Sequence, residues 1–141
     1  MKKYIILSII VIMAVTAIGY LCINYISISK ATLNSNKNYE SLLNKTITGT
    51  ELATYINQII DKNTKNSVEK DSSGYYINNN ENSIIVEIKF KDSDNIFRIE
   101  QISNNGIEKF INLYANLNFN CTKIEYHNKT KLISYLYFEE V

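Results

Sequence analysis

The most constraining feature of this sequence is a single apolar run from Tyr4 to Ile28. The run contains no charged side chain, and Asn24, near its far end, is its only strongly polar residue. Because a helix rises about 1.5 Å per residue, about 20 apolar residues cross the roughly 30 Å hydrocarbon core of a bilayer. A helix that is apolar on every side and this long is not expected as the core of a small soluble domain. The run therefore predicts a transmembrane helix whose partner over residues 4–28 is the membrane lipid bilayer.

The opening Met-Lys-Lys is also typical of a secretory signal peptide, so two interpretations compete. The apolar region of a signal peptide is about 7–15 residues long and ends at a site of small residues. Here the best such site, around Val15 to Ala17, would leave the apolar residues 18–28 exposed at the start of the mature chain. We therefore expect residues 1–28 to be an uncleaved N-terminal membrane anchor.

Lysines and segment lengths predict the orientation of this anchor. Lys2 and Lys3 precede the span, which favours a cytoplasmic N-terminus, although Lys30 and later lysines weaken the asymmetry. Three residues precede the span and 113 follow it, which is the shape of a signal anchor. We expect a single-pass protein of the cell membrane with its C-terminal domain outside.

The remaining chain is long enough for one modest core, with residues 29–45 as a polar stalk or linker and residues 46–141 as an extracytoplasmic domain. Of the 15 Lys and Arg residues, two precede the span, which leaves 13 against 14 Asp and Glu. A near-neutral domain carries no electrostatic footprint for nucleic acid, so no nucleic-acid partner is expected. The absence of proline and tryptophan and the abundance of asparagine, isoleucine, lysine and tyrosine indicate a low-GC bacterium.

The clearest local signal in the domain is a helix that starts at Thr48. Thr48 and Glu51 have the spacing of a capping box. Apolar residues then recur at steps of three and four up to a helix end near Asn63; they are Leu52, Tyr55, Ile56, Ile59 and Ile60.

Strands and a second helix are predicted in the rest of the domain. A helix starts at Ser103 or Asn104 and continues toward Leu117, with an apolar stripe of Ile107, Phe110, Ile111, Tyr114 and Leu117. Alternating or apolar segments predict strands at residues 75–77, 84–90, 96–99, 119–126 and 132–138. The last of these strands is apolar on both faces, which favours a central place in the sheet. The predicted class is α+β: an N-terminal transmembrane helix, then two helices packed on an antiparallel sheet of about four or five strands.

The sequence offers little catalytic chemistry. His127, the only histidine, precedes a polar turn and is expected to be exposed. One histidine and Cys121 do not make a zinc site, and neither a nucleophile elbow nor a phosphate-binding glycine loop is present in the sequence. We therefore predict no catalytic, cofactor-binding or metal-binding residues, no cofactor, and a protein that is not an enzyme.

Four smaller features of the sequence bear on function. Cys121 lies in an apolar strand-like segment and is expected to be a small buried hydrophobe, with a reactive or inter-chain thiol as the alternatives. The turn 92–95 resembles part of a calcium loop but lacks its glycine and closing glutamate, so a solvated turn is expected. Glycosylation-type patterns at residues 44–46, 120–122 and 128–130 arise by chance in an asparagine-rich chain. Tyrosines form either an exposed patch for a partner or part of the core; they are Tyr75, Tyr76, Tyr135 and Tyr137.

Three segments carry a resemblance: TITGTELATYINQIIDKNTKN at residues 46–66, IIVEIKFKDSDNIF at residues 84–97 and FNCTKIEYHNKTKLISYLYFEE at residues 119–140. They look like those of short, uncharacterised single-span membrane-anchored proteins of low-GC Gram-positive bacteria. The resemblance covers most of residues 46–141. It implies one module on one anchor and supplies no activity and no functional residues.

The expected function is a membrane-anchored domain that binds a protein or envelope partner. A pilin-like or secretion-apparatus structural subunit is the alternative, because pilins also place a small α+β head after an apolar N-terminal helix. The pilin processing pattern, a glycine followed by an aromatic residue and a glutamate at the head of the apolar run, is missing.

Overall fold

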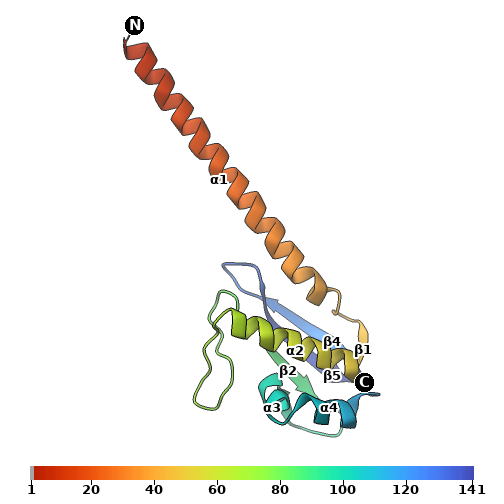
Figure 1. Ribbon diagram of the computed structural model, residues 1–141. Helices are drawn as coiled ribbons and strands as arrows, with labels where there is room; N and C mark the ends of the chain where they lie inside the picture. Colours follow the sequence, from red (N-terminus) through yellow and green to blue (C-terminus); the bar gives the residue numbers. More distant parts are fainter. Residues whose placement is uncertain (1) are drawn as a thin grey trace. The chain divides into compact units, whose positions relative to one another are not determined.

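The computed structural model describes residues 2–141 and contains two compact units, Met1–Ser35 and Asn36–Val141. Figure 1 shows the elements, and the second unit is called the head below. In chain order they are α1 (Lys2–Glu40), β1 (Thr46–Thr48), α2 (Gly49–Lys65), β2 (Ile85–Lys89), β3 (Ile96–Arg98), α3 (Ile99–Asn104), α4 (Ile107–Tyr114), β4 (Asn118–Tyr126) and β5 (Ile133–Glu140).

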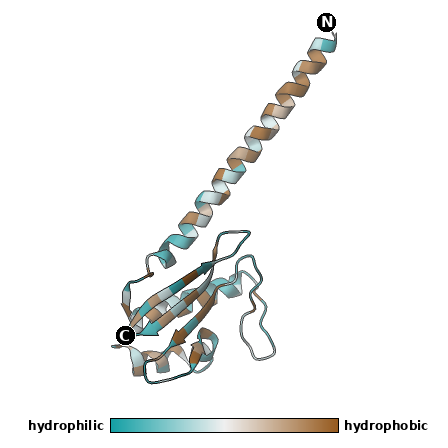
Figure 2. Ribbon diagram, turned by 180° about the vertical axis from the view of Figure 1, so that it is seen from behind, coloured by the Kyte–Doolittle hydropathy of each residue, from teal (hydrophilic) through white to brown (hydrophobic). Residues whose placement is uncertain are grey.

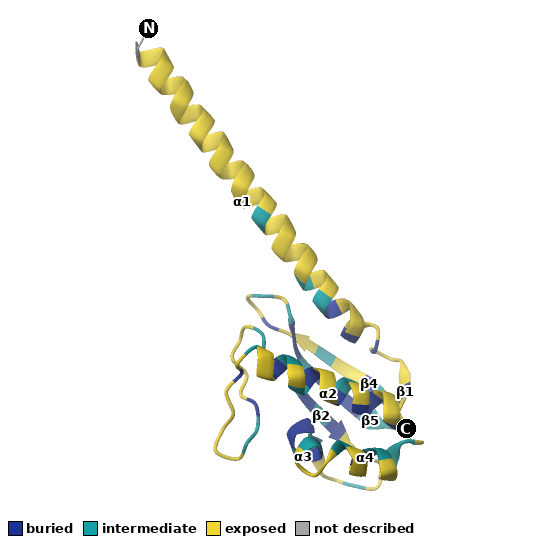
Figure 3. Cartoon of the chain, viewed as in Figure 1, coloured by how far each residue is buried: buried dark blue, intermediate teal, exposed yellow. Residues whose placement is uncertain are grey.

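The apolar run lies in helix α1 and buries almost none of its side chains (Figure 3). Two hydroxyl groups in the run bond within the helix: Ser8 Oγ donates to the Tyr4 carbonyl and Thr16 Oγ1 to the Met13 carbonyl, both at 2.9 Å. In the hydrocarbon core of a membrane, polar groups must find their hydrogen-bond partners within the protein because no water is available. The helix is long and apolar enough to cross a membrane, as an anchor or a signal sequence.

The head is built on one five-stranded sheet of order β1-β4-β5-β2-β3. Strand β5 is central, as its two apolar faces predicted, and the β4–β5 hairpin is also confirmed. The sheet is mixed rather than wholly antiparallel, because β2 pairs with β5 in parallel from Ile85↔Tyr135 to Lys89↔Glu139. The α+β class with a mostly antiparallel sheet is therefore confirmed, with one parallel pair added.

Helices α2, α3 and α4 cover one face of the sheet, and the view from behind in Figure 2 shows the other face without a helix. The predicted capping box starts α2: Glu51 Oε2 accepts from the Thr48 backbone N–H at 2.8 Å, and Thr48 Oγ1 accepts from the Glu51 N–H at 3.3 Å. The helix expected from residue 103 or 104 is α4, which begins slightly later, at Ile107; a further short helix, α3, precedes it over Ile99–Asn104 and was not predicted. Gly106 lies between them with φ +92°, a conformation that glycine adopts without strain.

Two expectations about strands were wrong. Residues 75–77 form no strand, only an isolated bridge between Lys70 and Tyr76 within the loop from α2 to β2. Conversely, Thr46–Thr48 forms β1 at the sheet edge, paired with β4. The three residues Thr46–Thr48 are too few to show the alternation by which a strand is recognised in a sequence.

The core lies between the helices and the sheet. Its fully buried large side chains come from nearly every element of the head; among them are Leu42, Ile47, Leu52, Ile56, Ile59, Ile84, Ile88, Ile99, Phe119, Ile133, Leu136 and Phe138. The alternation predicted for residues 84–90 is present, since Ile84, Val86, Ile88 and Phe90 are all buried. Part of the segment expected to be a polar stalk or linker, residues 29–45, also contributes to this core through Tyr39 and Leu42.

Gly49, the first residue of α2, places this helix directly against the end of α4. Its backbone N–H donates to the Leu117 carbonyl at 2.9 Å, and a Cβ added at Gly49 would overlap the Tyr114 carbonyl. Because the obstacle is backbone, the two helices must separate to admit a methyl group.

We therefore predict that Gly49→Ala destabilises the head by about 1–3 kcal/mol and lowers its thermal midpoint by about 5 °C or more. Near-ultraviolet circular dichroism of the tyrosines, on the full chain in detergent micelles, measures this midpoint. Thr50→Ala, a neighbouring change at an exposed position, is the control and should stay within about 0.5 kcal/mol. Equal midpoints for the two variants would show that the backbone around Gly49 and Tyr114 shifts at little cost to admit a methyl group.

Candidate binding groove

His127 is buried, with 3% of its surface exposed, so the expectation of an exposed turn residue was wrong. Its Nε2 lies 2.8 Å from the Ser83 carbonyl oxygen, and its backbone N–H and carbonyl bond to Leu132 and Lys131. The imidazole thus connects the β4–β5 turn to the residue before Ile84, a structural role. Local sequence gave no signal for this contact because Ser83 is 44 residues away.

Cys121 is fully buried, which confirms the small-hydrophobe interpretation. Its Sγ lies 3.7 Å from the Lys123 carbonyl oxygen, and burial raises the pKa of the thiol to about 11. A thiol in this state is almost wholly protonated at neutral pH and is a poor nucleophile.

The acidic turn at residues 92–95 connects β2 to β3. Ser93 Oγ accepts from the Asn95 N–H at 3.1 Å, and both aspartates are exposed. Within residues 2–141, no group of three or more His, Cys, Asp or Glu side chains is placed to hold a metal ion.

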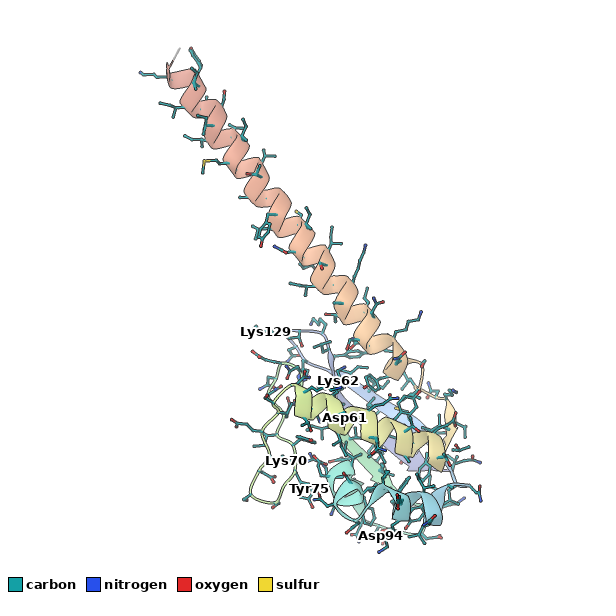
Figure 4. The ribbon with its side chains drawn as sticks, viewed as in Figure 1. Asp61, Lys62, Lys70, Tyr75, Asp94 and Lys129 are labelled. Atoms are coloured by element: carbon teal, nitrogen blue, oxygen red, sulfur yellow. The ribbon has the colours of Figure 1, made fainter. Side chains whose placement is uncertain are left out.

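The four tyrosines that could form an exposed patch for a partner have different surroundings. Tyr76 is buried, whereas Tyr75, labelled in Figure 4, lies over the Arg98 guanidinium at 5.2 Å. Tyr135 and Tyr137 are partly buried and stack with ring centroids 6.5 Å apart. The Tyr135 hydroxyl donates to Glu87 Oε2 at 2.7 Å, and burial together with this carboxylate raises the pKa of Tyr135. At most three of the four are thus available to a partner.

An ion pair holds the long loop between α2 and β2 against α3. Glu100 is 2% exposed, and its Oε1 accepts from Arg98 Nη2 at 3.0 Å and from the Tyr76 N–H at 2.7 Å. Arg98 Nη2 also donates to the Tyr76 carbonyl at 2.9 Å. These bonds satisfy loop backbone groups that no strand pairs, so we interpret the pair as structural.

An open groove of about 260 Å³ lies beside α4, where β2 and β3 approach the helix. Aromatic and aliphatic side chains form most of its wall, and the lining residues are Phe90, Phe97, Ile102, Asn105, Gly106, Lys109, Phe110, Leu113 and Tyr114. Lys109 is the only charged residue among them.

Packed aromatic rings make the floor of the groove rigid. Phe90 contacts Tyr114, Phe97 and Phe119 with ring centroids 4.6, 5.3 and 5.9 Å apart. Edge-to-face and tilted pairs at these distances are favourable, so the floor is preformed. By contrast, Leu113 at the rim is 61% exposed.

Sequence reasoning identified part of this groove but not the groove itself. The apolar stripe predicted for the second helix contains Phe110 and Tyr114, which do line it. Leu113 and Lys109 lie beside that stripe and looked like ordinary surface positions. Only the packing of α4 on the β2–β3 hairpin brings these residues of α4 together with Phe90 and Phe97.

The state of Cys121 gives a direct prediction. In a Cys22→Ser background, alkylation of Cys121 at pH 8 should be at least about 100-fold slower in the folded chain than in urea, from thiol ionisation alone. Because burial raises the pKa of the thiol from its ordinary value of 9.0 to about 11, the contribution of the neutral thiol to stability is complete below pH 9 and is lost as pH rises toward 11. A Ser72→Cys thiol in a chain lacking both native cysteines is the exposed control. Equal alkylation rates for the folded and unfolded chains would contradict the burial of Cys121.

Neither a family model, nor a curated protein, nor a solved structure matches this chain. The similarity to single-span proteins of low-GC Gram-positive bacteria therefore stays a prediction.

Proposed function

We propose that this is a non-enzymatic, single-span membrane protein that presents its head outside the cell and binds an envelope protein. The observation that carries the proposal is the groove beside α4, which combines a packed aromatic floor with one exposed leucine, Leu113, at its rim. Apolar surface is costly to leave in water, so an apolar hollow of this kind favours an apolar occupant.

The size of the groove favours a protein side chain over a small-molecule ligand. Small-molecule sites are clefts of roughly 300–1,000 Å³ that enclose most of the ligand, whereas this groove is open and about 260 Å³. Protein interfaces commonly place one large apolar or aromatic side chain in such a pocket, surrounded by polar contacts. The occupant we propose is a protruding aromatic or large aliphatic side chain of a partner protein.

If the anchor is retained, a groove of low affinity is sufficient for binding a partner in the same envelope layer. Burying one large apolar side chain contributes roughly 1.5–3 kcal/mol, which is too little for tight binding between freely diffusing proteins. Confinement of both partners to the same envelope layer raises their effective concentration without any new contact. The apolar helix α1 and the modest groove are thus parts of one mechanism.

The outward orientation predicts labelling from outside. Ser72→Cys, placed in an exposed part of the α2–β2 loop of a chain lacking Cys22 and Cys121, should react with a membrane-impermeant maleimide in intact cells. A Lys3→Cys variant in the same background is the control for the opposite side and should react only after lysis. Reaction of Ser72→Cys only after lysis would overturn the proposed orientation.

The groove predicts site-specific crosslinking. With p-benzoylphenylalanine at Leu113, irradiation of intact cells should give one discrete heavier adduct, because this side chain lies at the rim. The same group at Leu43, which is 45% exposed and does not line the groove, should give none.

Two results would contradict binding through the groove. Equal adducts from both positions would indicate nonspecific contact. An adduct at a multiple of the chain's own mass would instead indicate a self-assembling structural subunit.

A further inference from the structure

We propose that the groove recognises an acidic segment of the partner, in which a carboxylate neighbours the apolar side chain that enters the groove. This inference rests on the proposed function and specifies the chemistry of its occupant. It follows from the one charge that the groove presents and from the position of that charge relative to the apolar rim.

Lys109 is a cation available to a partner. Its side chain is exposed, and in the described part of the chain it is not a member of the ion pairs Arg98–Glu100, Lys123–Glu125 or Lys129–Glu81. A lysine at the edge of an apolar groove lays its methylene groups along the wall and keeps its ammonium group in water. The ammonium group is thus positioned to meet a carboxylate at low desolvation cost.

The spacing of Lys109 and Leu113 on α4 limits the distance between the carboxylate and the apolar side chain of the partner segment. Lys109 and Leu113 are four residues apart on one helix, so their Cβ atoms lie about 5–6 Å apart on the same side. A carboxylate bound to Lys109 must therefore lie within a few residues of the apolar side chain that contacts Leu113. Asn105, which also lines the groove, adds an amide that can donate to the same carboxylate.

The rest of the groove lining gives no reason to prefer a basic partner segment. The other residues of the lining are uncharged, so a basic segment would meet the like charge of Lys109 there; the exposed carboxylates of Asp92, Asp94 and Glu108 lie outside the lining. Like charges brought together in an interface suppress the wrong partner, which makes Lys109 a specificity determinant as well as an attractive contact.

Defined peptides test the inference on the full chain in nanodiscs of neutral phosphatidylcholine. Three acetylated and amidated peptides carry a central 4-fluorophenylalanine flanked on both sides by Asp, Asn or Lys, and fluorine NMR titration gives each Kd. We expect the Asp-flanked peptide to bind about three- to fivefold more tightly than the Asn-flanked peptide, and the Lys-flanked peptide to bind most weakly. The difference should vanish at about 0.5 M salt, where exposed charges are screened.

Substitutions assign the preference to one residue. Lys109→Gln should remove the difference between the Asp and Asn peptides, and Lys109→Glu should reverse the order of the Asp and Lys peptides. Lys65→Gln makes the same charge change at an exposed position of α2 that does not line the groove, and should leave the preference intact.

Failure of the inference and failure of the proposed function give different results. Equal Kd values for the Asp and Asn peptides on the unmodified chain would overturn the acidic preference and leave the groove as a binding site. If an Asp-flanked peptide with alanine in place of the ring competes as well as the aromatic one, or if no aromatic peptide binds, the groove itself is not the site.

Discussion

The parallel pairing of β2 with β5 is the constraint on which the rest of the head depends. Parallel neighbours cannot be joined by a tight turn, so the chain needs a long connection between them, and it runs through β3, α3, α4 and β4. This connection places α4 over the β2–β3 hairpin on the face that α2 also covers (Figure 1). The groove lies where α4 packs beside Phe90, which is buried, and Phe97, which is only partly buried.

Buried amides stabilise the ends of the two parallel strands, where regular pairing stops. The Asn63 side chain accepts from the Ile84 N–H and donates to the Ile84 carbonyl, both at 2.8 Å. Asn36 likewise accepts from the Ile133 N–H at 3.1 Å and donates to the Lys131 carbonyl at 2.8 Å. Each amide replaces a missing strand neighbour, so buried backbone groups keep their hydrogen bonds. In a chain rich in asparagine, these two have a definite structural purpose.

What the sequence predicted well was local, and what it missed depends on distant contacts. The capping box at Thr48, the alternation around Val86 and the two-faced apolar character of β5 are each encoded within a few residues. The burial of His127 depends on Ser83, and the direction of β5 relative to β2 depends on the connection between them. The groove belongs to the second kind, because three separate elements supply its lining and none carries a motif.

The aromatic floor and Lys109 have different roles in the groove because their interactions differ in strength. A rigid aromatic floor loses little conformational freedom when it is filled, so most of the free energy of an apolar occupant is retained as binding. An exposed lysine adds less affinity than the floor, because water and salt screen its charge. A head with nearly balanced charges has no strong long-range field, so Lys109 acts only at contact distance. The floor therefore sets whether a segment binds, and Lys109 sets which of the segments that fit the floor is preferred.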